Sequence, residues 1–199
     1  MLSEILIATK NVGKAAEFKR IFGEKGITVK TLLDLPDVPE IIEDGKTFEE
    51  NALKKAQTLT DKLNMAVLAD DSGLSIDYLN GQPGVYSARY AGDHNDAANR
   101  QKVLEKLKGV DDTNRGAHFN CALVVTSPDK KPLVKVGIVD GRITTSEKGE
   151  NGFGYDSIFY YPEYKRTFAE LTQDEKNKIS HRGRAIEKLM ESFDGWMKN

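Results

Sequence analysis

The stretch TFEENALKKAQTLTDKLNMAVLA, residues 47–69, decides the fold because its apolar residues change from helical to strand spacing within one run. Thr47 and Glu50 have the spacing of a capping box, with Thr47 as the N-cap and Glu50 reaching back. Residues 66–69 form a short apolar run typical of a buried strand. Between them, apolar residues recur at the spacing of one helix face: Phe48, Ala52, Ala56, Leu59 and Leu63.

The same alternation continues outward in both directions along the chain. Strands are predicted at residues 4–8, 27–29, 74–77, 118–126, 133–139 and 157–160, and residues 70–73 are predicted to be an acidic turn. Helices are predicted after Gly13, from about Asp93 to Lys108, after a second capping box at Thr172, and at the C-terminal end. Strands joined first by helices and then by a hairpin indicate an α/β fold with a mixed sheet, in a single domain covering residues 1–199.

Composition narrows the class of protein. The 199 residues fit one domain, and 29 Lys and Arg against 31 Asp and Glu give a net charge of −2, which offers no basic surface for nucleic acid or an anionic membrane. Cys121 is the only cysteine and alternates with apolar residues, so we expect a buried thiol in a reducing compartment. With no apolar run of 18 residues and an N-terminus that leads directly into a strand, we expect a cytoplasmic protein with no membrane span or signal peptide.

The segment from Thr9 to Lys14 lies at the first strand-to-helix junction. The N–H groups and positive dipole end of the helix, together with Lys10 and Lys14, would suit a phosphate group. The segment has one glycine and is not a Walker loop, so an ordinary turn with solvated lysines stays an alternative.

Two acidic segments are candidates for metal or proton chemistry. Asp70 and Asp71 are adjacent, and one of them could bind Mg²⁺ or accept a proton from water; an acidic turn is the alternative. Glu43 could supply a second carboxylate. Asn51 and Lys55 lie four residues apart on one stripe of the capped helix, where a solvated lysine is the more common case.

Two further segments could recognise a nucleobase. Glycines on either side of Phe153, in the run that ends Gly154, Tyr155, Asp156, would let backbone approach a flat ligand on which the ring stacks, although a turn with a buried Phe is equally consistent. Lys176 precedes the run Ser180, His181, Arg182, whose donors suit carbonyl or phosphate oxygens better than a metal.

In combination, these segments resemble one family. The pattern T-x-N-x-x-K at residues 9–14, followed by TFEENALKKA, LADDSGLSIDYLNGQPGVYSARYAG, GFGYDSIF and LTQDEKNKISHRG, resembles the inosine/xanthosine triphosphate pyrophosphatases, the HAM1-like enzymes, over nearly the whole chain. The resemblance implies a long central mixed sheet with helices forming two lobes around a substrate cleft, in a homodimer. It also implies Mg²⁺-dependent hydrolysis of non-standard purine nucleoside triphosphates (ITP, dITP, XTP) to the monophosphate and pyrophosphate.

The resemblance also implies roles for individual residues. Glu43 and Asp71 would hold Mg²⁺, and Asp71 would accept the proton. The phosphates would be bound by Thr9, Lys10, Asn11, Val12, Gly13 and Lys14, with help from Lys55, Asp70 and Ser72. The base and the rest of the nucleotide would be bound by Phe153, Gly154, Tyr155, Asp156, Lys176, His181 and Arg182.

Three alternatives stay open. A sister pyrophosphatase for other modified nucleotides should lack the Phe-Gly-Tyr-Asp and Ser-His-Arg segments. A nucleotide-binding regulator without catalysis should have lost a carboxylate, yet Glu43, Asp70 and Asp71 are all present. A phosphatase would release orthophosphate instead of pyrophosphate.

Overall fold

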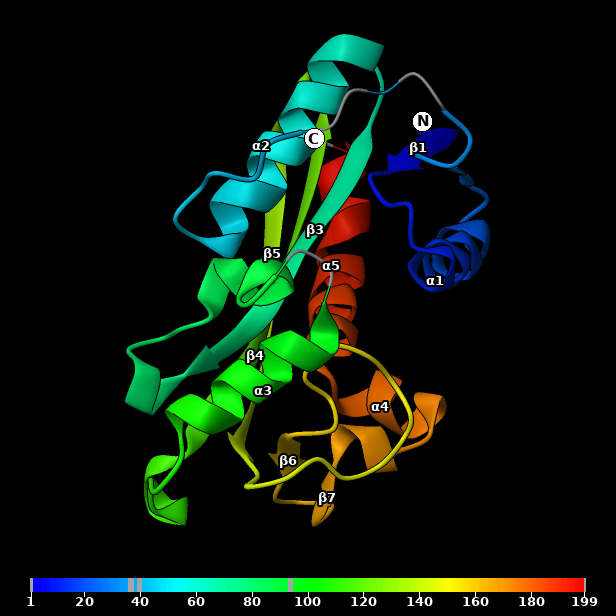
Figure 1. The fold of residues 1–199 in the computed structure, drawn as a ribbon. Coiled ribbons are helices and arrows are strands. Elements are labelled where there is room, and N and C mark those ends of the chain that lie inside the picture. The colour runs from blue at the N-terminus through cyan, green and yellow to red at the C-terminus, as the bar shows by residue number, and fades with distance from the viewer. Residues whose placement is uncertain (1, 36–37, 39–40, 93–94, 199) are drawn as a thin grey trace. The chain divides into compact units, whose positions relative to one another are not determined.

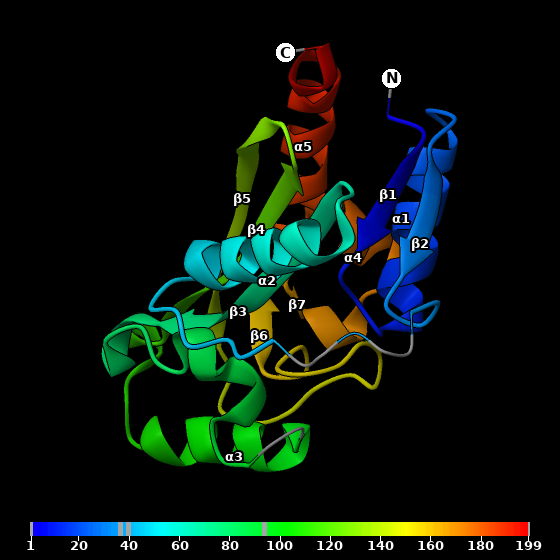
Figure 2. The same cartoon turned by 90° about the horizontal axis from the view of Figure 1, so that it is seen from above.

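The computed structural model describes residues 2–35, 38, 41–92 and 95–198. Its helices are α1 (Val12–Gly23), α2 (Phe48–Leu63), α3 (Asp96–Lys106), α4 (Gln173–Ile179) and α5 (His181–Lys198). Its strands are β1 (Glu4–Ile7), β2 (Thr28–Thr31), β3 (Val67–Ile76), β4 (Gly116–Ser127), β5 (Lys130–Ile143), β6 (Phe159–Tyr161) and β7 (Arg166–Thr167). Figure 1 labels all of these elements except β2, which is labelled in Figure 2. None of the described helices is long and apolar enough to cross a membrane.

The described strands form one seven-stranded sheet in the order β2-β1-β3-β4-β5-β6-β7. β1 runs parallel to both β2 and β3, whereas β6 is antiparallel to β5 and to β7. The predicted α/β fold with a mixed sheet is therefore confirmed.

Two local predictions need correction. Residues 70–73 are not a turn, because β3 continues through them from Val67 to Ile76. The hairpin is longer than predicted: β4 ends at Ser127 and β5 begins at Lys130, so only two residues separate the strands. The predicted start of α3 at Asp93 lies outside the described residues.

The chain divides into two compact units. The first comprises residues 1–71, 122–136 and 186–199, and the second comprises residues 72–121 and 137–185. In the first unit, α1 lies beside β1 and β2 (Figure 2), and its Phe22 packs against Phe193 of α5 with ring centroids 5.2 Å apart. Cys121 in the second unit is fully buried, as expected.

Each unit has its own apolar core. In the first unit, the helix face predicted for residues 48–63 packs Ala52, Ala56 and Leu59 against strand residues such as Leu6 and Val124. In the second unit, the rings of Phe119, Phe159 and Phe168 pack together; their centroids are 4.6 to 5.9 Å apart. These fully packed surroundings make the elements that carry the site rigid.

Candidate functional site

The start of α1 forms a capped turn. Asn11 is the N-cap: its side chain accepts the Lys14 backbone N–H at 3.0 Å, and its own N–H donates to the Thr9 hydroxyl at 3.1 Å. Lys10, Val12 and Gly13 are exposed. The predicted helix start is thus confirmed, and the remaining N–H groups at this end are those that suit an anion.

Lys14 points from α1 to β3. Its ammonium lies 2.5 Å from the carboxylate of Asp70, whose side chain is only 4% exposed. A lysine held by a buried carboxylate has a fixed position, unlike the solvated lysine of the simpler interpretation. Asp70 therefore holds a cation in place beside the start of α1.

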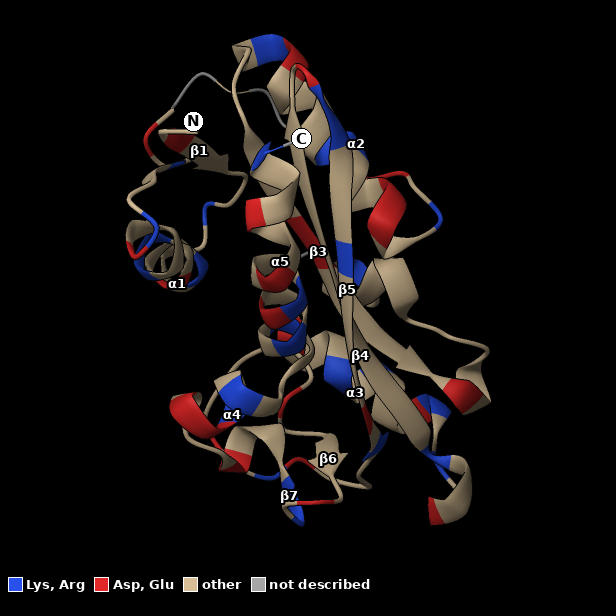
Figure 3. Ribbon diagram, turned by 180° about the vertical axis from the view of Figure 1, so that it is seen from behind, with Lys and Arg blue, Asp and Glu red and all other residues tan. Residues whose placement is uncertain are grey.

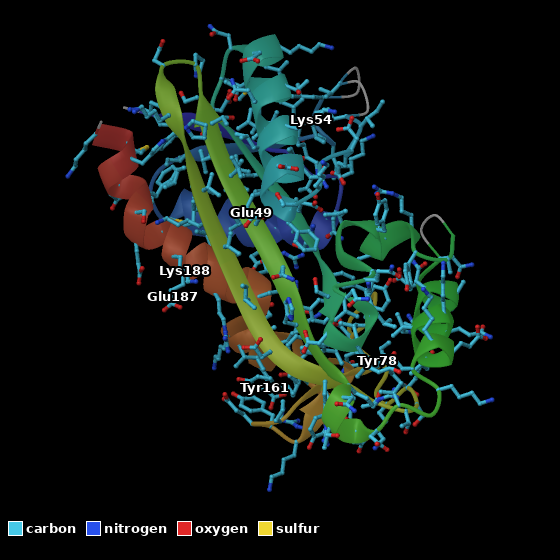
Figure 4. All side chains as sticks on the ribbon, turned by 90° about the vertical axis from the view of Figure 1, so that its left-hand side faces the viewer. Glu49, Lys54, Tyr78, Tyr161, Glu187 and Lys188 are labelled. Atoms are coloured by element: carbon cyan, nitrogen blue, oxygen red, sulfur yellow. The ribbon has the colours of Figure 1, made fainter. Side chains whose placement is uncertain are left out.

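Lys55 on α2 makes a second arrangement of this kind. It forms an ion pair with Glu43 and donates to the backbone carbonyl of Asp70 at 3.1 Å. Its side chain is 17% exposed, so the solvated interpretation is wrong for this residue. Lys54, the residue before it, pairs instead with Asp44, and both of these side chains are exposed. Figure 4 labels Lys54 on α2.

Asp70 and Asp71 point in different directions because they follow each other in an extended strand. Asp70 is buried, whereas Asp71 is half-buried and accepts a hydrogen bond from the Asn51 side chain at 2.9 Å. Figure 3 shows the two as an acidic band on β3. Ser72 follows in the same strand, half-buried, and is the first residue of the second unit.

Among the described residues, no three His, Cys, Asp or Glu side chains gather into a metal-binding cluster. Glu43 and Asp71 are nevertheless hard oxygen donors, carried on segments that α2 ties together through Lys55 and Asn51. Mg²⁺ commonly takes only one or two protein carboxylates and keeps waters and substrate phosphates as its other ligands. The donor set present therefore fits Mg²⁺.

In the second unit, the backbone conformation of the loop around Phe153 depends on the glycines on either side of it. Gly152 and Gly154 have φ values of +78° and +59°, a region that favours glycine. The Phe153 ring is 58% exposed, so the interpretation as a buried Phe is wrong. An exposed ring on a rigid loop is available for stacking.

Asp156 and Lys176 fix this loop in place through a hydrogen bond and an ion pair. The Asp156 carboxylate accepts the Phe153 N–H at 2.9 Å and lies 2.5 Å from the Lys176 ammonium. That ammonium also lies 4.8 Å from the centre of the Phe153 ring, within cation–π range. The pair is buried, with side-chain exposures of 5% and 9%, so one carboxylate fixes both the loop backbone and the cation under the ring.

Tyr155 turns into the core instead. It is 4% exposed, and its hydroxyl donates to the Ser87 carbonyl at 2.7 Å. Burial raises the pKa of this phenol, so it stays neutral. Only its backbone is left to meet a ligand.

His181 and Arg182 begin α5 directly after Ser180, so the run lies at a helix start, as predicted. The Ser180 hydroxyl accepts the Gly183 N–H at 3.1 Å and caps the helix. The His181 ring is buried and stacks on Phe119, with centroids 4.8 Å apart and planes 14° from parallel. Arg182 is half-buried beside it in the chain.

Sequence reasoning missed two residues of α3 that hold the Phe153 loop. Arg100 donates to the Gly154 carbonyl and to Glu147, each at 2.8 Å, and Asp96 accepts the Gly154 N–H at 2.8 Å. A hollow of about 200 Å³, bordered by Arg100, Glu147 and Phe153, lies here. Polar residues on a helix carry no sequence signal that separates such a contact from solvation.

The chain is therefore an α/β protein with a mixed sheet, a group of paired lysines and carboxylates in the first unit, and an exposed aromatic ring on a glycine-containing loop in the second. The chain matches the Ham1 family over residues 5–192, and it belongs to that family.

Relatives and solved structures agree. The chain is 52% identical over 198 residues to the dITP/XTP pyrophosphatase of Bacillus anthracis, covering 98% of each chain, and 50% identical to that of Geobacillus kaustophilus, covering 97% of this chain and 95% of the relative. The structure of the Staphylococcus aureus Ham1 protein is 44% identical, with a TM-score of 0.91 over 96% of this chain and 98% of that one. A HAM1 protein from Coxiella burnetii has the same identity and TM-score, covering 98% and 100%.

Proposed function

We propose that this protein hydrolyses non-standard purine nucleoside triphosphates, dITP, ITP and XTP, to the monophosphate and pyrophosphate. The observation that carries the proposal is the group of fixed cations and carboxylates in the first unit: Lys14 on Asp70, and Lys55 on Glu43 and the Asp70 carbonyl. Relatives about half identical over nearly the whole chain bear the name of that activity.

The lysines suit a polyphosphate because hydrolysis of a phosphoanhydride depends mainly on positioning and charge neutralisation. Lys14 and Lys55 would each meet phosphate oxygens without first being ordered, since carboxylates already hold them. The backbone N–H groups at the start of α1 would donate hydrogen bonds to the same phosphate oxygens.

Asp71 is the proposed proton acceptor. Its carboxylate is half-buried and oriented by Asn51, which suits a group that must hold one water molecule in line with phosphorus. Glu43 and Asp71 would hold Mg²⁺, which would offset the charge on the departing pyrophosphate. Asp70 would act indirectly, by holding Lys14.

Base recognition is assigned to the second unit. The exposed Phe153 ring would stack on the purine, worth about 1–3 kcal/mol. Donors from His181, Arg182 or backbone N–H would suit the keto oxygen that hypoxanthine and xanthine carry at C6. Adenine has an amino donor there, and a buried unpaired donor costs about 1–3 kcal/mol, or roughly ten- to hundredfold per contact.

Product identity tests the activity. The protein is incubated with Mg²⁺ and, separately, dITP, ITP, XTP, GTP and ATP, and the products are separated by ion exchange. Monophosphate plus pyrophosphate from dITP, ITP and XTP, with much slower use of GTP and ATP, is the expected result. Diphosphate plus orthophosphate would refute the proposal and favour a phosphatase.

Paired variants test the site. Asp71→Asn should abolish turnover and leave nucleotide binding measurable by calorimetry. Lys55→Ala should lower activity at least tenfold, whereas Lys54→Ala, which removes only the exposed pair with Asp44, should not. Equal effects of the two lysine variants would show that Lys55 has no special role.

The homodimer implied by the family resemblance and the cytoplasmic location expected from the composition belong to the same proposal. Sedimentation equilibrium tests the first, where a mass twice that of the chain is expected. Cell fractionation with an antibody tests the second.

A further inference from the structure

Asn51 on α2 makes two hydrogen bonds to two different segments of the first unit. Its side-chain oxygen accepts the Gly45 N–H at 2.7 Å, and its side-chain nitrogen donates to the Asp71 carboxylate at 2.9 Å. The residue is 1% exposed. A backbone N–H can only donate and a carboxylate can only accept, so the two partners fix which way the amide faces.

The Gly45 side of this contact is close-packed. A Cβ at Gly45 would lie 2.7 Å from the Asn51 side-chain oxygen and 2.9 Å from the Glu50 Cβ, so only glycine fits. Glu50 also accepts the next backbone N–H, that of Lys46, at 2.6 Å. This also corrects the predicted capping box: Thr47 caps α2, but Glu50 reaches back to Lys46 and not to Thr47.

The segment that Asn51 holds is the one that carries Glu43, two residues before Gly45. One helical turn further along α2, Lys55 pairs with Glu43 and donates to the Asp70 carbonyl. The helix thus connects the Glu43 segment to β3 twice. The Asn51 amide reaches Asp71, and the Lys55 ammonium reaches Asp70. The predicted stripe of Asn51 and Lys55 is the face of α2 that makes both connections.

We infer that Asn51 is a positioning residue that orients the Asp71 carboxylate and fixes its place relative to the segment bearing Glu43. A carboxamide suits this place because it presents a donor on one side and an acceptor on the other. Aspartate would set a second anion against Asp71, and an apolar residue would remove the acceptor of the half-buried Gly45 N–H. The inference rests on the proposed function, in which Glu43 and Asp71 are the Mg²⁺ ligands.

Loss of a residue that orients a metal ligand commonly costs 10–100-fold in metal affinity or activity. The loss should fall mainly on kcat, because Asn51 meets no part of the nucleotide in this scheme, with KM for dITP changed less than threefold. A residue needed only for folding would instead lower the amount of active protein and leave kcat per folded molecule unchanged.

Two substitutions separate the two hydrogen bonds. Asn51→Asp keeps the acceptor for Gly45 and removes the donor to Asp71; Asn51→Leu removes both. Gln57→Leu is the matched control, because Gln57 is an exposed amide of the same helix that donates to Asp61 at 2.7 Å. Circular dichroism melts establish that each variant is folded, and the isosteric aspartate variant serves if the leucine variant is not.

Three measurements decide the inference: kcat and KM with dITP, Mn²⁺ affinity of the nucleotide-free protein by electron paramagnetic resonance, and hydrogen exchange at the Gly45 amide. We expect both variants to lose at least tenfold in kcat, Asn51→Leu to bind Mn²⁺ at least tenfold more weakly, and Gly45 exchange to accelerate in Asn51→Leu alone. Variants of Asn51 within twofold of the unmodified protein in kcat and Mn²⁺ affinity would overturn it. An unmodified protein inactive on dITP would refute the proposed function, and the metal and exchange measurements would still decide the role of Asn51.

Discussion

Breaking the ion pair between Asp156 and Lys176 should cost several kcal/mol, because the pair is buried and the partner left behind would be a charge without its counter-ion. The Asp156 carboxylate also accepts the Phe153 N–H. Removing one partner of such a pair leaves an uncompensated charge and costs about 3–5 kcal/mol. Asp156→Asn keeps an acceptor for Phe153 and removes only the charge. Lys176→Met keeps the apolar stem and removes the ammonium. Each variant should therefore lose about 3–5 kcal/mol of unfolding free energy.

The double variant distinguishes a charge effect from lost packing. With both charges gone, no buried ion is left alone, so its loss should be smaller than the sum of the single losses by about 2–3 kcal/mol. Urea unfolding followed by circular dichroism measures all four proteins. With a slope near 2–3 kcal/mol per molar urea, each single variant should shift the midpoint by roughly 1–2.5 M.

An exposed pair provides the control. Arg20 and Glu24 lie 3.4 Å apart on α1 with both side chains 69% exposed, and Glu24→Gln should cost less than about 1 kcal/mol. Single losses below about 1 kcal/mol for Asp156 and Lys176, with an additive double variant, would refute the reasoning. That result would mean that water reaches the pair and that Phe153 is not held by it.

Three further predictions test other contacts. The pKa of Glu175 is lowered from 4.5 to about 2, mainly by the hydrogen bond from the Thr172 backbone N–H and next by the Arg166 guanidinium. The ionised Glu175 therefore stabilises the fold fully above pH 4.5, and this stabilisation is lost as the pH falls toward 2. The difference in urea midpoint between the protein and Glu175→Gln should therefore close over that window, and a constant difference would contradict this. Gly152→Ala should lower the free energy of unfolding, measured by thermal unfolding, by about 1–3 kcal/mol or more. The φ of Gly152 is +78°, and the new Cβ would clash with the Asp156 carboxylate. Arg100→Ala should raise KM for dITP severalfold with a smaller change in kcat, because the substitution removes the hydrogen bond to the backbone of the loop around Phe153. An unchanged KM in steady-state assays would show that this loop keeps its conformation without Arg100.

The sequence predicted the features whose interacting residues lie close together in the chain. Thr47 and Thr172 cap their helices with side-chain acceptors three residues from the donor, a pattern visible in the chain itself. The apolar face of α2 was likewise readable because its period is local. Helix starts, helix faces and the mixed sheet were therefore accessible from the sequence.

The continuity of β3 was not accessible, because Asp70, Asp71, Ser72 and Gly73 have the composition of a turn. The contacts of this segment are supplied by other elements: β3 lies between β1 and β4 in the sheet, Lys14 from α1 meets one aspartate, and Asn51 from α2 meets the next. Partners this distant in the chain leave no periodic trace. Arg100 escaped prediction for the same reason, since its acceptor lies 54 residues away.

The pairing of charges also explains why a protein proposed to bind a polyanion is nearly neutral. Lys14, Lys55 and Lys176 each have a carboxylate in contact, so these three cations proposed for the nucleotide add no net charge. An unpaired lysine would be more attractive to phosphate, but its flexible side chain would lose up to about 2 kcal/mol of rotamer entropy on binding. A lysine already held by a carboxylate has lost that freedom during folding, and the same carboxylates include a candidate Mg²⁺ ligand. Position, and not excess positive charge, is therefore what these residues contribute.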